Sequence, residues 1–282
     1  MDVALATYSL LPGLDADDAP LIAALVARGL SVRPVIWDDA TFDWSQARVC
    51  VVRSTWDYSE RRDEFVGWAE RISGVTRLFN AAEVIRWNTH KGYLRDLAAR
   101  GVPVVPTEWV AKDGHLDTTA LFRERGWTDA VIKPAVSANA RGTFRVTAAT
   151  AQAQLDASVL SGDVMIQPYL QCVEAYGERA IIVIDGEPSH AVRKSSAFER
   201  AKDPTLLEGT PVALDPAEVR IARDVLRAVP YPLLYARVDL VRDATNTPVV
   251  MELELVEPSL FFATAPHAAT SLAQAIAARV HA

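Results

Sequence analysis

The sequence has little cysteine and no candidate leader or membrane segment. Only Cys50 and Cys172 occur among the 282 residues, far apart and without a C-x-x-C pair, which excludes a disulfide framework and favours reduced thiols. The N-terminus, MDVALATYSLLPG, lacks the basic region and long apolar run of a signal peptide. No stretch approaches the roughly 20 apolar residues of a transmembrane helix. We therefore expect a cytoplasmic protein with no membrane partner.

Basic residues are in deficit. Lysine and arginine number 29 against 36 aspartate and glutamate, for a formal net charge of -7, which argues against a nucleic-acid partner. Hydrophobic residues make up 50% and charged residues 23% of the chain. This composition and length predict a large packed core shared by two or three small domains.

The motifs of several enzyme classes are missing. The sequence contains no GxxxxGK[ST], GxGxxG, HExxH or GxSxG, which argues against P-loop, dinucleotide-binding, zinc-protease and α/β-hydrolase chemistry. No triad-like motif suggests a protein nucleophile. The histidines show no metal-ligand spacing, so we expect them to be surface or capping residues: His90, His115, His190, His267 and His281.

The first third of the chain has the order of strands and helices that is typical of a small parallel α/β domain. We predict strands at 3–7, 31–36 and 49–53, with helices at 19–28 and 61–73, and we place this domain at residues 1–86. A helix at 89–100, with Asn88 or Thr89 as its N-cap, is expected to open the next part.

The remaining two-thirds predicts two α+β lobes, at residues 87–168 and 169–282. Strands are expected within 102–110, 130–135 and 164–170, then a hairpin at 179–194 turning at Asp185-Gly186. A helix at 216–228, strands at 235–241 and 248–255 and a final helix at 268–280 follow. The polar stretch 194–211 reads as a surface loop or a mobile flap.

Carboxylates converge in the predicted strands 235–241 and 248–255. Alternation places Glu252 and Glu254 on one face, and Asp239 on the same face as Arg237. If the strands pair through the loop DATNTP, three carboxylates meet and raise one another's pKa unless a hard cation such as Mg²⁺ joins them. The alternative is a solvated face, or acids paired by Arg237 and other arginines.

Two lysines add to this pattern. Lys91 lies near the start of a predicted helix, and Lys133 lies inside an apolar strand, where an ammonium group needs an anionic partner. A small-residue loop follows Lys133 and could bring backbone N–H groups close to an anion. These features together suit a nucleoside triphosphate with Mg²⁺; the loop residues are Ser137, Ala138, Asn139, Arg141 and Gly142.

A family resemblance rests on motifs in order along residues 80–261. They are NTHK, VIKP followed by SANARGTFR, IQPYL followed by GERAIIVIDGEPSHAVRK, RVDLV and MELELVEPS. In this order they resemble the ATP-grasp superfamily, in its glutathione-synthetase and RimK-like branch. The resemblance implies an ATP-grasp fold, α/β plus α+β, in which two α+β lobes enclose ATP behind a small N-terminal parallel α/β domain.

The resemblance also implies roles for individual residues. Lys91 and Lys133 would contact the ATP phosphates, and the loop from Ser137 to Gly142 would close over them. The adenine-side residues would be Gln167, Pro168, Tyr169, Leu170, Glu174 and Glu178; the catalytic cations Arg193, Lys194 and Arg237; and the Mg²⁺ ligands Asp239, Glu252 and Glu254. Two departures stand out: many relatives carry Asn at the position of Glu254, and the phosphate loop has a single glycine, Gly142.

Substrate residues are expected at the carboxyl end of the strand 49–53, where open α/β sheets bind ligands. In the run RSTWDY, Arg53 would hold a carboxylate, Asp57 an amino group, and Trp56 or Tyr58 a wall of the pocket. The alternative is a strand terminus with an exposed Arg–Asp pair and a packed tryptophan. The full candidate set is Arg53, Ser54, Thr55, Trp56, Asp57, Tyr58, Glu257 and Ser259.

Within the superfamily, RSTWDY, IRWNTHK, PSHAVRK and EPSL resemble the O-ureido-serine cyclo-ligases, which close the ring of cycloserine. This implies an ATP- and Mg²⁺-dependent ligase that activates the carboxylate of a small amino-acid-like substrate as an acyl-phosphate for attack by a nitrogen. Intermolecular ligation of amino acids or dipeptides, a small-molecule kinase and a non-catalytic nucleotide-binding module remain alternatives. The sequence leaves open whether the protein is a homo-oligomer.

Overall fold

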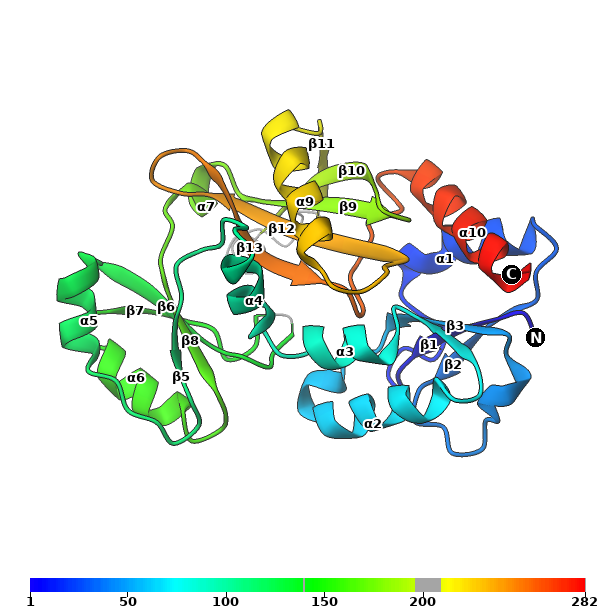
Figure 1. Ribbon diagram of the computed structural model, residues 1–282, viewed down its shortest axis with the longest axis horizontal. Helices are drawn as coiled ribbons and strands as arrows, with labels where there is room; N and C mark the ends of the chain where they lie inside the picture. The colour runs from blue at the N-terminus through cyan, green and yellow to red at the C-terminus, as the bar shows by residue number, and fades with distance from the viewer. Residues whose placement is uncertain (139, 196–208, 282) are drawn as a thin grey trace.

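The chain builds three β-sheets, the first of which is parallel (Figure 1). The computed structural model describes residues 1–138, 140–195 and 209–281. The parallel sheet has the order β2-β1-β3-β4. Its strands are β1 (Val3–Thr7), β2 (Val32–Ile36), β3 (Val49–Ser54) and β4 (Arg77–Phe79). The parallel α/β architecture predicted for this region is confirmed, with β4 in addition.

Both faces of this sheet are covered by helices. Leu5 and Val51 pack with α1 (Ala19–Val26) and α10 (Pro266–His281). Ala6 and Val52 pack against α2 (Arg62–Ile72) and α3 (Ala82–Asn88) on the opposite face. Strands buried on both faces are near-continuous apolar runs, which explains why β1 is apolar over residues 3–6 and β3 over residues 49–52. Three short 3-10 helices lie in the connections: Ala16–Asp18, Trp44–Gln46 and Tyr58–Glu60.

A second, antiparallel sheet has the order β5-β8-β6-β7. Its strands are β5 (Glu108–Val110), β6 (Asp129–Pro134), β7 (Phe144–Thr147) and β8 (Val164–Pro168). Helices α5 (Thr118–Arg125) and α6 (Ala151–Ser158) pack on one face, against Ala130 and Ile132. Since side chains alternate along β6, Lys133 points to the opposite face.

The third sheet, antiparallel with order β11-β10-β9-β12-β13, lies at the centre (Figure 1). Its strands are β9 (Glu178–Ile184), β10 (Glu187–Lys194), β11 (Gly209–Val212), β12 (Tyr235–Arg242) and β13 (Pro248–Glu254), with α7 (Cys172–Ala175) preceding them. The predicted β9–β10 hairpin turns at Asp185 and Gly186, whose positive φ angles of 51° and 85° suit a two-residue turn.

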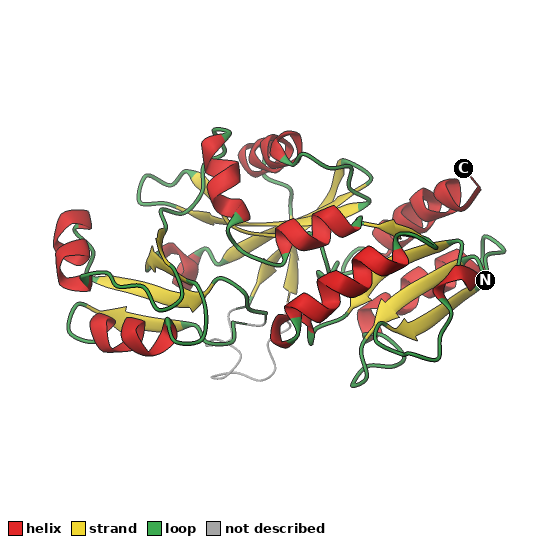
Figure 2. Ribbon diagram, turned by 60° about the horizontal axis from the view of Figure 1, so that its bottom comes forward, coloured by secondary structure: helices red, strands yellow, loops and turns green. Residues whose placement is uncertain are grey.

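Helices α4 (Tyr93–Ala99) and α9 (Pro216–Ala228) cover one face of this central sheet. Leu94 and Val225 there join one apolar cluster with Ile181 and Val238. The alternation of β12 therefore directs Arg237 and Asp239 to the opposite face. Figure 2 shows the helices on the outside of the sheets.

The C-terminal helix returns to the N-terminal sheet. Leu272 and Ile276 of α10 share an apolar cluster with Leu21 and Leu25 of α1, and the two helices run side by side in Figure 1. The division at residues 1–86, 87–168 and 169–282 stays a prediction: the 86/87 boundary falls inside α3, and the 168/169 boundary falls at the end of β8. Within the described residues, no helix is long and apolar enough to cross a membrane.

The helix predicted at 89–100 is present as α4 (Tyr93–Ala99), but its predicted start and N-cap are wrong. Asn88 ends α3, the backbone N–H of Lys91 donates to the carbonyl oxygen of Ala135 at 2.8 Å, and α4 begins only at Tyr93. The Asn88 side chain does not cap a helix, because its amide bonds the backbone of Leu253 and Leu255 in and after β13. Long-range hydrogen bonds of Asn88 and Lys91 thus keep residues 89–92 out of the expected helix. The strand expected within 102–110 shortens to β5.

Candidate active site

The β12–β13 pairing brings three carboxylates together. Asp239 lies opposite Glu252, and Arg237 lies opposite Glu254. One oxygen from each of Asp239, Glu252 and Glu254 lies within 4.8 Å of the others. The hairpin and the convergence expected from period-two alternation are therefore present in the fold.

Cations from neighbouring strands pair with these acids. Arg237 donates to Asp239 Oδ1 at 2.9 Å and also contacts Glu254. The Lys194 ammonium donates to Asp239 Oδ2 at 2.7 Å and to Glu178 Oε1 at 2.6 Å. The alternative expectation, that Arg237 pairs with the acids, describes this arrangement. A face that balances its own charges in this way can exchange those partners for a charged ligand.

Two lysines approach the same face from other elements. Lys91 contacts Glu252, and its Nζ donates to the carbonyl oxygen of Ser137 at 3.3 Å. Lys133 Nζ lies 3.9 Å from Met251 Sδ and has no carboxylate at ion-pair distance within the described part of the chain. Burial lowers the pKa of Lys133, and Glu252 offsets only part of that effect. Lys133 is thus a half-buried cation without a full counter-charge, as expected for a group that meets an anionic ligand.

Burial and charge set the protonation of the acids. Burial alone would raise the pKa of Glu252, but Lys91 and Lys133 outweigh it and lower that pKa to about 2. Arg237 and Lys194 likewise overcome burial and hold the pKa of Asp239 below its ordinary value. Burial, with the charges of Asp239 and Glu252, raises the pKa of Glu254 to about 7 despite Arg237. The third carboxylate is the one that this face tolerates least as an anion.

The predicted phosphate loop joins β6 to β7. Gly142 has a φ of +70°, and a Cβ at this position would lie 2.9 Å from Pro134 Cγ, so the single glycine is required. Ser137 Oγ donates to the Pro134 carbonyl at 3.4 Å, and the Ala138 carbonyl accepts from the Arg141 N–H at 3.0 Å. The Arg141 side chain is exposed and contacts Glu60. Asn139 lies outside the described residues, as do residues 196–208 of the expected flap.

The expected adenine-side residues lie at the end of β8 and beyond it. Gln167 donates to Thr107 Oγ1 at 2.9 Å, and Pro168 is the last residue of the strand. The Tyr169 phenol donates to Glu174 Oε1 at 2.8 Å, while Leu170 packs with Val105 and Met251. Arg145, which sequence reasoning missed, places its guanidinium 3.7 Å from the centroid of the Tyr169 ring. Glu178 lies apart from this group, beside Lys194.

Arg53 is buried in an ion pair instead of lying open. Its Nε donates to Asp18 Oδ1 at 2.8 Å, both side chains are 2% exposed, and Ser54 Oγ also donates to Asp18, at 3.3 Å. The alternative of an exposed Arg–Asp pair is wrong, since the partner is Asp18, 35 residues earlier in the chain. Sequence reasoning missed Asp18 because nothing in the local pattern links it to Arg53.

The rest of the RSTWDY run divides between the core and the site. Asp57 accepts from Trp37 Nε1 at 2.9 Å and lies 3.5 Å from Arg61, so it already has two partners. Tyr58 packs against Phe65, and Thr55 is fully buried. Trp56 reaches across to the Glu257 carbonyl, 3.4 Å from its Nε1. Trp56 and Arg53 are the residues of this run whose side chains hydrogen-bond the backbone after β13 within the described part of the chain.

The catalytic cations divide in a similar way. Lys194 and Arg237 meet at Asp239. Arg193, on the other face of β10, donates through Nε to the Tyr176 carbonyl at 3.2 Å.

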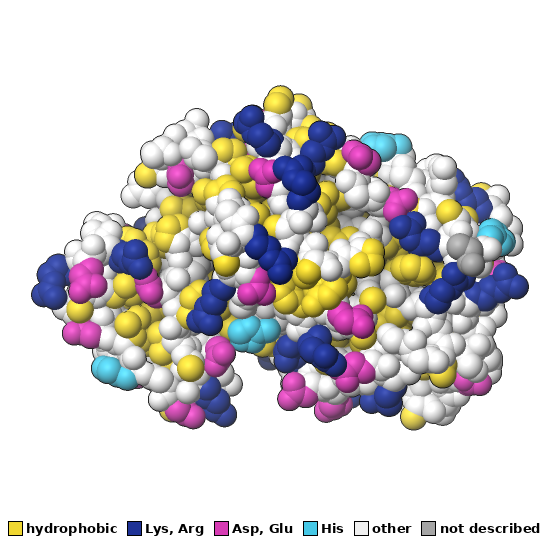
Figure 3. Space-filling model, viewed as in Figure 1, with side chains coloured by type: hydrophobic (Ala, Val, Ile, Leu, Met, Phe, Trp, Pro, Cys, Tyr) yellow, Lys and Arg dark blue, Asp and Glu magenta, His cyan; other side chains and the backbone are white. Residues whose placement is uncertain are grey.

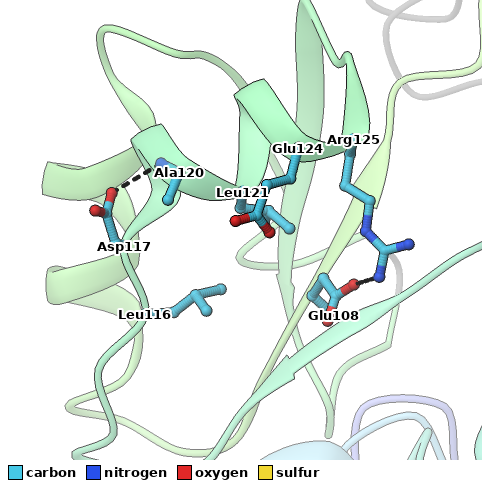
Figure 4. Close-up of a pocket in the computed structure, with 7 residues that line it drawn as sticks. All are labelled: Glu108, Leu116, Asp117, Ala120, Leu121, Glu124 and Arg125. Carbon is cyan, nitrogen blue, oxygen red and sulfur yellow. Dashed lines mark hydrogen bonds and ion pairs between the residues drawn. The ribbon is translucent and has the colours of Figure 1, made fainter.

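A surface hollow of about 470 Å³ lies beside α5 (Figure 4). Its lining includes Glu108, Asp117 and Arg125 and contains no predicted site residue. Figure 3 shows acidic and basic side chains interspersed over one face of the molecule.

Comparison with known proteins agrees with this arrangement. Residues 3–80 match the family profile of the N-terminal domain of D-cycloserine synthetase DcsG. Across 99% of the chain, the sequence is 35% identical to the cycloserine biosynthesis protein DcsG of Streptomyces lavendulae, 98% of which is covered. The crystal structure of D-cycloserine synthetase DcsG superposes with a TM-score of 0.87 at 32% identity, over 99% of this chain and 100% of that one.

The likeness in fold extends further. The D-alanine–D-alanine ligase of Bacillus anthracis, in a crystal structure complexed with ATP, has a TM-score of 0.69 at 16% identity, with 100% of this chain and 97% of that one covered. These neighbours confirm the ATP-grasp fold expected from the sequence. The chain belongs to the DcsG family within the ATP-grasp superfamily, and it is an ATP-dependent, ADP-forming carbon–nitrogen ligase.

Proposed function

We propose that this ligase binds Mg²⁺ and ATP over the charged face of β12 and β13 and closes the ring of cycloserine from O-ureido-serine. One observation carries the proposal: Asp239, Glu252 and Glu254 converge where Lys91, Lys133 and Lys194 also meet. A full-length relative named for cycloserine biosynthesis supports the choice of product.

The donor set fits a magnesium ion. Asp239, Glu252 and Glu254 offer three carboxylate oxygens close together, and Mg²⁺ prefers oxygen ligands. When bound there, the ion would neutralise charge on the ATP phosphates. Lys91 and Lys194 now pair with two of these carboxylates, so both are candidates to turn to phosphate oxygens.

The chain's own residues would position and neutralise the nucleotide. Lys91 and Lys133 would hold phosphates, the loop with Ser137, Ala138, Asn139, Arg141 and Gly142 would cover them, and Tyr169 and Leu170 would lie against adenine. Lys194 and Arg237 would bear charge that develops on the transferred phosphoryl group. Such catalysis works by placement and electrostatics, and it needs no protein nucleophile.

The proposed reaction consists of a phosphoryl transfer, a ring closure and the loss of the carbamoyl group. A carboxylate oxygen of the substrate attacks the γ-phosphorus, ADP leaves, and an acyl-phosphate forms. The ureido nitrogen next to the oxygen then attacks the acyl carbon, which closes a five-membered ring and expels phosphate. Cycloserine lacks the carbamoyl group of O-ureido-serine, so that group leaves by hydrolysis as carbon dioxide and ammonia.

The free thiols of Cys50 and Cys172 suit a reducing cytoplasm, where we place this reaction.

A product assay separates the alternatives. The full chain is incubated with ATP, MgCl₂ and either O-ureido-serine enantiomer, or with pairs of amino acids, while ADP, free phosphate and organic products are measured. Ring closure predicts ADP, phosphate and cycloserine in equal amounts. A linear amide would instead establish intermolecular ligation, and a stable phosphorylated product would establish a kinase; either result would overturn the proposal.

A further inference from the structure

Side chains from other elements contact every backbone carbonyl in the segment that directly follows β13. Each carbonyl oxygen of residues 255–260, the post-acidic segment, lies within hydrogen-bond distance of a different side-chain donor. In chain order the donors are Asn80 (2.7 Å), Tyr235 (2.8 Å), Trp56 (3.4 Å), Arg53 (3.0 Å), Arg237 (3.4 Å) and His190 (3.0 Å). Tyr235 shares its one hydroxyl proton between the carbonyl oxygens of Val256 and of Val52, the latter at 2.7 Å. Because a carbonyl can only accept, the His190 proton lies on Nε2.

The donors come from both sides of the segment. Asn80, Trp56 and Arg53 belong to the N-terminal part, whereas Tyr235, Arg237 and His190 belong to the central sheet. Five of the six donor residues are buried, all except Trp56. A connection from β13 to α10 does not need six side chains to hold it in place. Such a rigid backbone is suited to fixing the direction of one of its own side chains.

The Glu257 side chain is the charged one in this segment. The residue is 8% exposed, and its carboxylate meets its own backbone N–H but receives no hydrogen bond or ion pair from any other described residue. Burial and the charge of Glu254 raise the pKa of Glu257 to about 8. Lys91 and Arg237 influence it from a distance, yet both are bound to other carboxylates. A buried carboxylate without its own cation is costly to keep, which indicates a role for it.

We propose that Glu257 receives the α-ammonium group of the amino-acid-like substrate. This inference rests on the proposed function, since it supplies the cation that the carboxylate lacks. Asp57, to which the sequence assigned this role, is occupied by Trp37 and Arg61. In an α-amino acid the ammonium and the carboxylate share one carbon atom. The group that binds the ammonium must therefore lie beside the site of phosphoryl transfer, and Glu257 follows Glu254 by three residues.

The other donors then act as positioning residues. Trp56 and Arg53 hold the carbonyls of Glu257 and Pro258, which belong to the two peptide units that follow the Glu257 Cα. Neither has to touch substrate to matter. This assigns to the RSTWDY run a function different from direct binding of the substrate carboxylate by Arg53.

The test compares O-ureido-serine with its des-amino analogue, 3-(ureidooxy)propanoate, in wild type, Glu257→Gln and Glu257→Asp. The wild type should prefer the amino substrate in kcat/KM by at least about tenfold, as expected of a charge-assisted hydrogen bond. Glu257→Gln should raise KM for the amino substrate far more than it changes kcat, and should bring the two substrates to near equality. Glu257→Asp should lie between. Glu83→Gln, an exposed change on α3, is the matched control and should behave as wild type.

An unchanged preference for the amino substrate in folded Glu257→Gln would overturn the inference. Folding is checked by thermal unfolding, and the ATP-binding site by the Kd for ATP, which should not change. If Glu257→Gln does not fold, Glu257→Asp decides: an unchanged amino preference there overturns the inference. If the wild type ligates another amino acid instead, the proposed ring closure fails, and the same amino and des-amino comparison with that substrate still tests Glu257.

Discussion

The Arg53 guanidinium donates to the carbonyl oxygen of Pro258 at 3.0 Å, which joins the end of β3 to the post-acidic segment. Asp18 holds the same guanidinium from the other side, and all of this lies out of water. Arg53 therefore links the N-terminal sheet to the post-acidic segment. It positions the backbone of this segment as well as neutralising Asp18.

Removing Arg53 should be strongly destabilising. Arg53→Met strands the buried Asp18 carboxylate, so we expect the free energy of unfolding to fall by about 3–5 kcal/mol. Urea unfolding at neutral pH measures this. Adding Asp18→Asn to the same protein removes the stranded charge and should restore much of the loss. A loss below about 1 kcal/mol in the single variant would contradict this view of the pair.

Lys91 and Lys133 should respond differently to the same substitution. Lys91→Met leaves Glu252 without its ion-pair partner, so we expect a loss of about 1–3 kcal/mol in the free energy of unfolding. Lys133→Met removes a half-buried ammonium that has no ion pair among the described residues, so stability should hold or rise by up to about 1 kcal/mol.

Both lysine variants should bind ATP at least about tenfold more weakly, as titration calorimetry would show. The two substitutions serve as each other's control, because they remove the same charge from the same face. Equal losses of stability, or unchanged ATP affinity in Lys133→Met, would show that the lysines are not divided between structural and nucleotide roles.

Local patterns predicted the elements whose signals are local. The β12–β13 hairpin followed from alternation around Asp239, Glu252 and Glu254, and the β9–β10 hairpin followed from Asp185-Gly186. The helix expected at 89–100 begins only at Tyr93, because the Lys91 N–H bonds Ala135, a residue distant in the sequence. β7 was missed although FRVT alternates apolar and polar residues, because four residues directly after the small-residue loop are a short signal.

Prediction of the site from the sequence has the same limit. Residue types and their order predicted that acids and lysines would meet, because opposite charges in apolar strands require partners. The partners themselves came from distant elements, as with Asp18 for Arg53, or Trp37 for Asp57. The six donors to the post-acidic segment come from four separate parts of the chain, and no spacing in the sequence brings them together.

Replacing Glu257 by a neutral side chain should stabilise the unliganded protein relative to wild type, and this gain should grow as pH rises. Its folded pKa of about 8 exceeds the ordinary value of 4.5, so the folded state binds this proton more tightly than the unfolded chain does. The contribution of Glu257 to stability therefore falls as pH rises from about 4.5 to about 8. The groups that face it are Glu254, Lys91, Arg237, Tyr58 and Tyr235.

Glu257→Gln should match wild type near pH 5 and exceed it by on the order of 1–3 kcal/mol near pH 8.5. Unfolding free energies measured without nucleotide or Mg²⁺ across this range check it. A difference that does not change with pH would show that the Glu257 carboxylate is not buried at a cost. A variant that is more stable yet binds substrate worse is the pattern of a functional residue.

Asp239→Asn and Glu252→Gln should each lower phosphate release by about 100-fold or more. Each removes a carboxylate from the candidate Mg²⁺ site, so higher MgCl₂ should recover part of the rate. Glu83→Gln, which changes the same charge on an exposed surface, should have the wild-type rate and Mg²⁺ dependence. Full turnover in either site variant would refute the metal assignment.

The central claim is that the substrate carboxylate is activated as an acyl-phosphate and then closes a ring. The direct measurement uses O-ureido-serine labelled with ¹⁸O in both carboxylate oxygens and follows the released phosphate by mass spectrometry. We predict one ¹⁸O atom in each phosphate released, together with an equal amount of cycloserine that retains the other. Phosphate without the label, or label transfer without a cyclic product, would contradict the account.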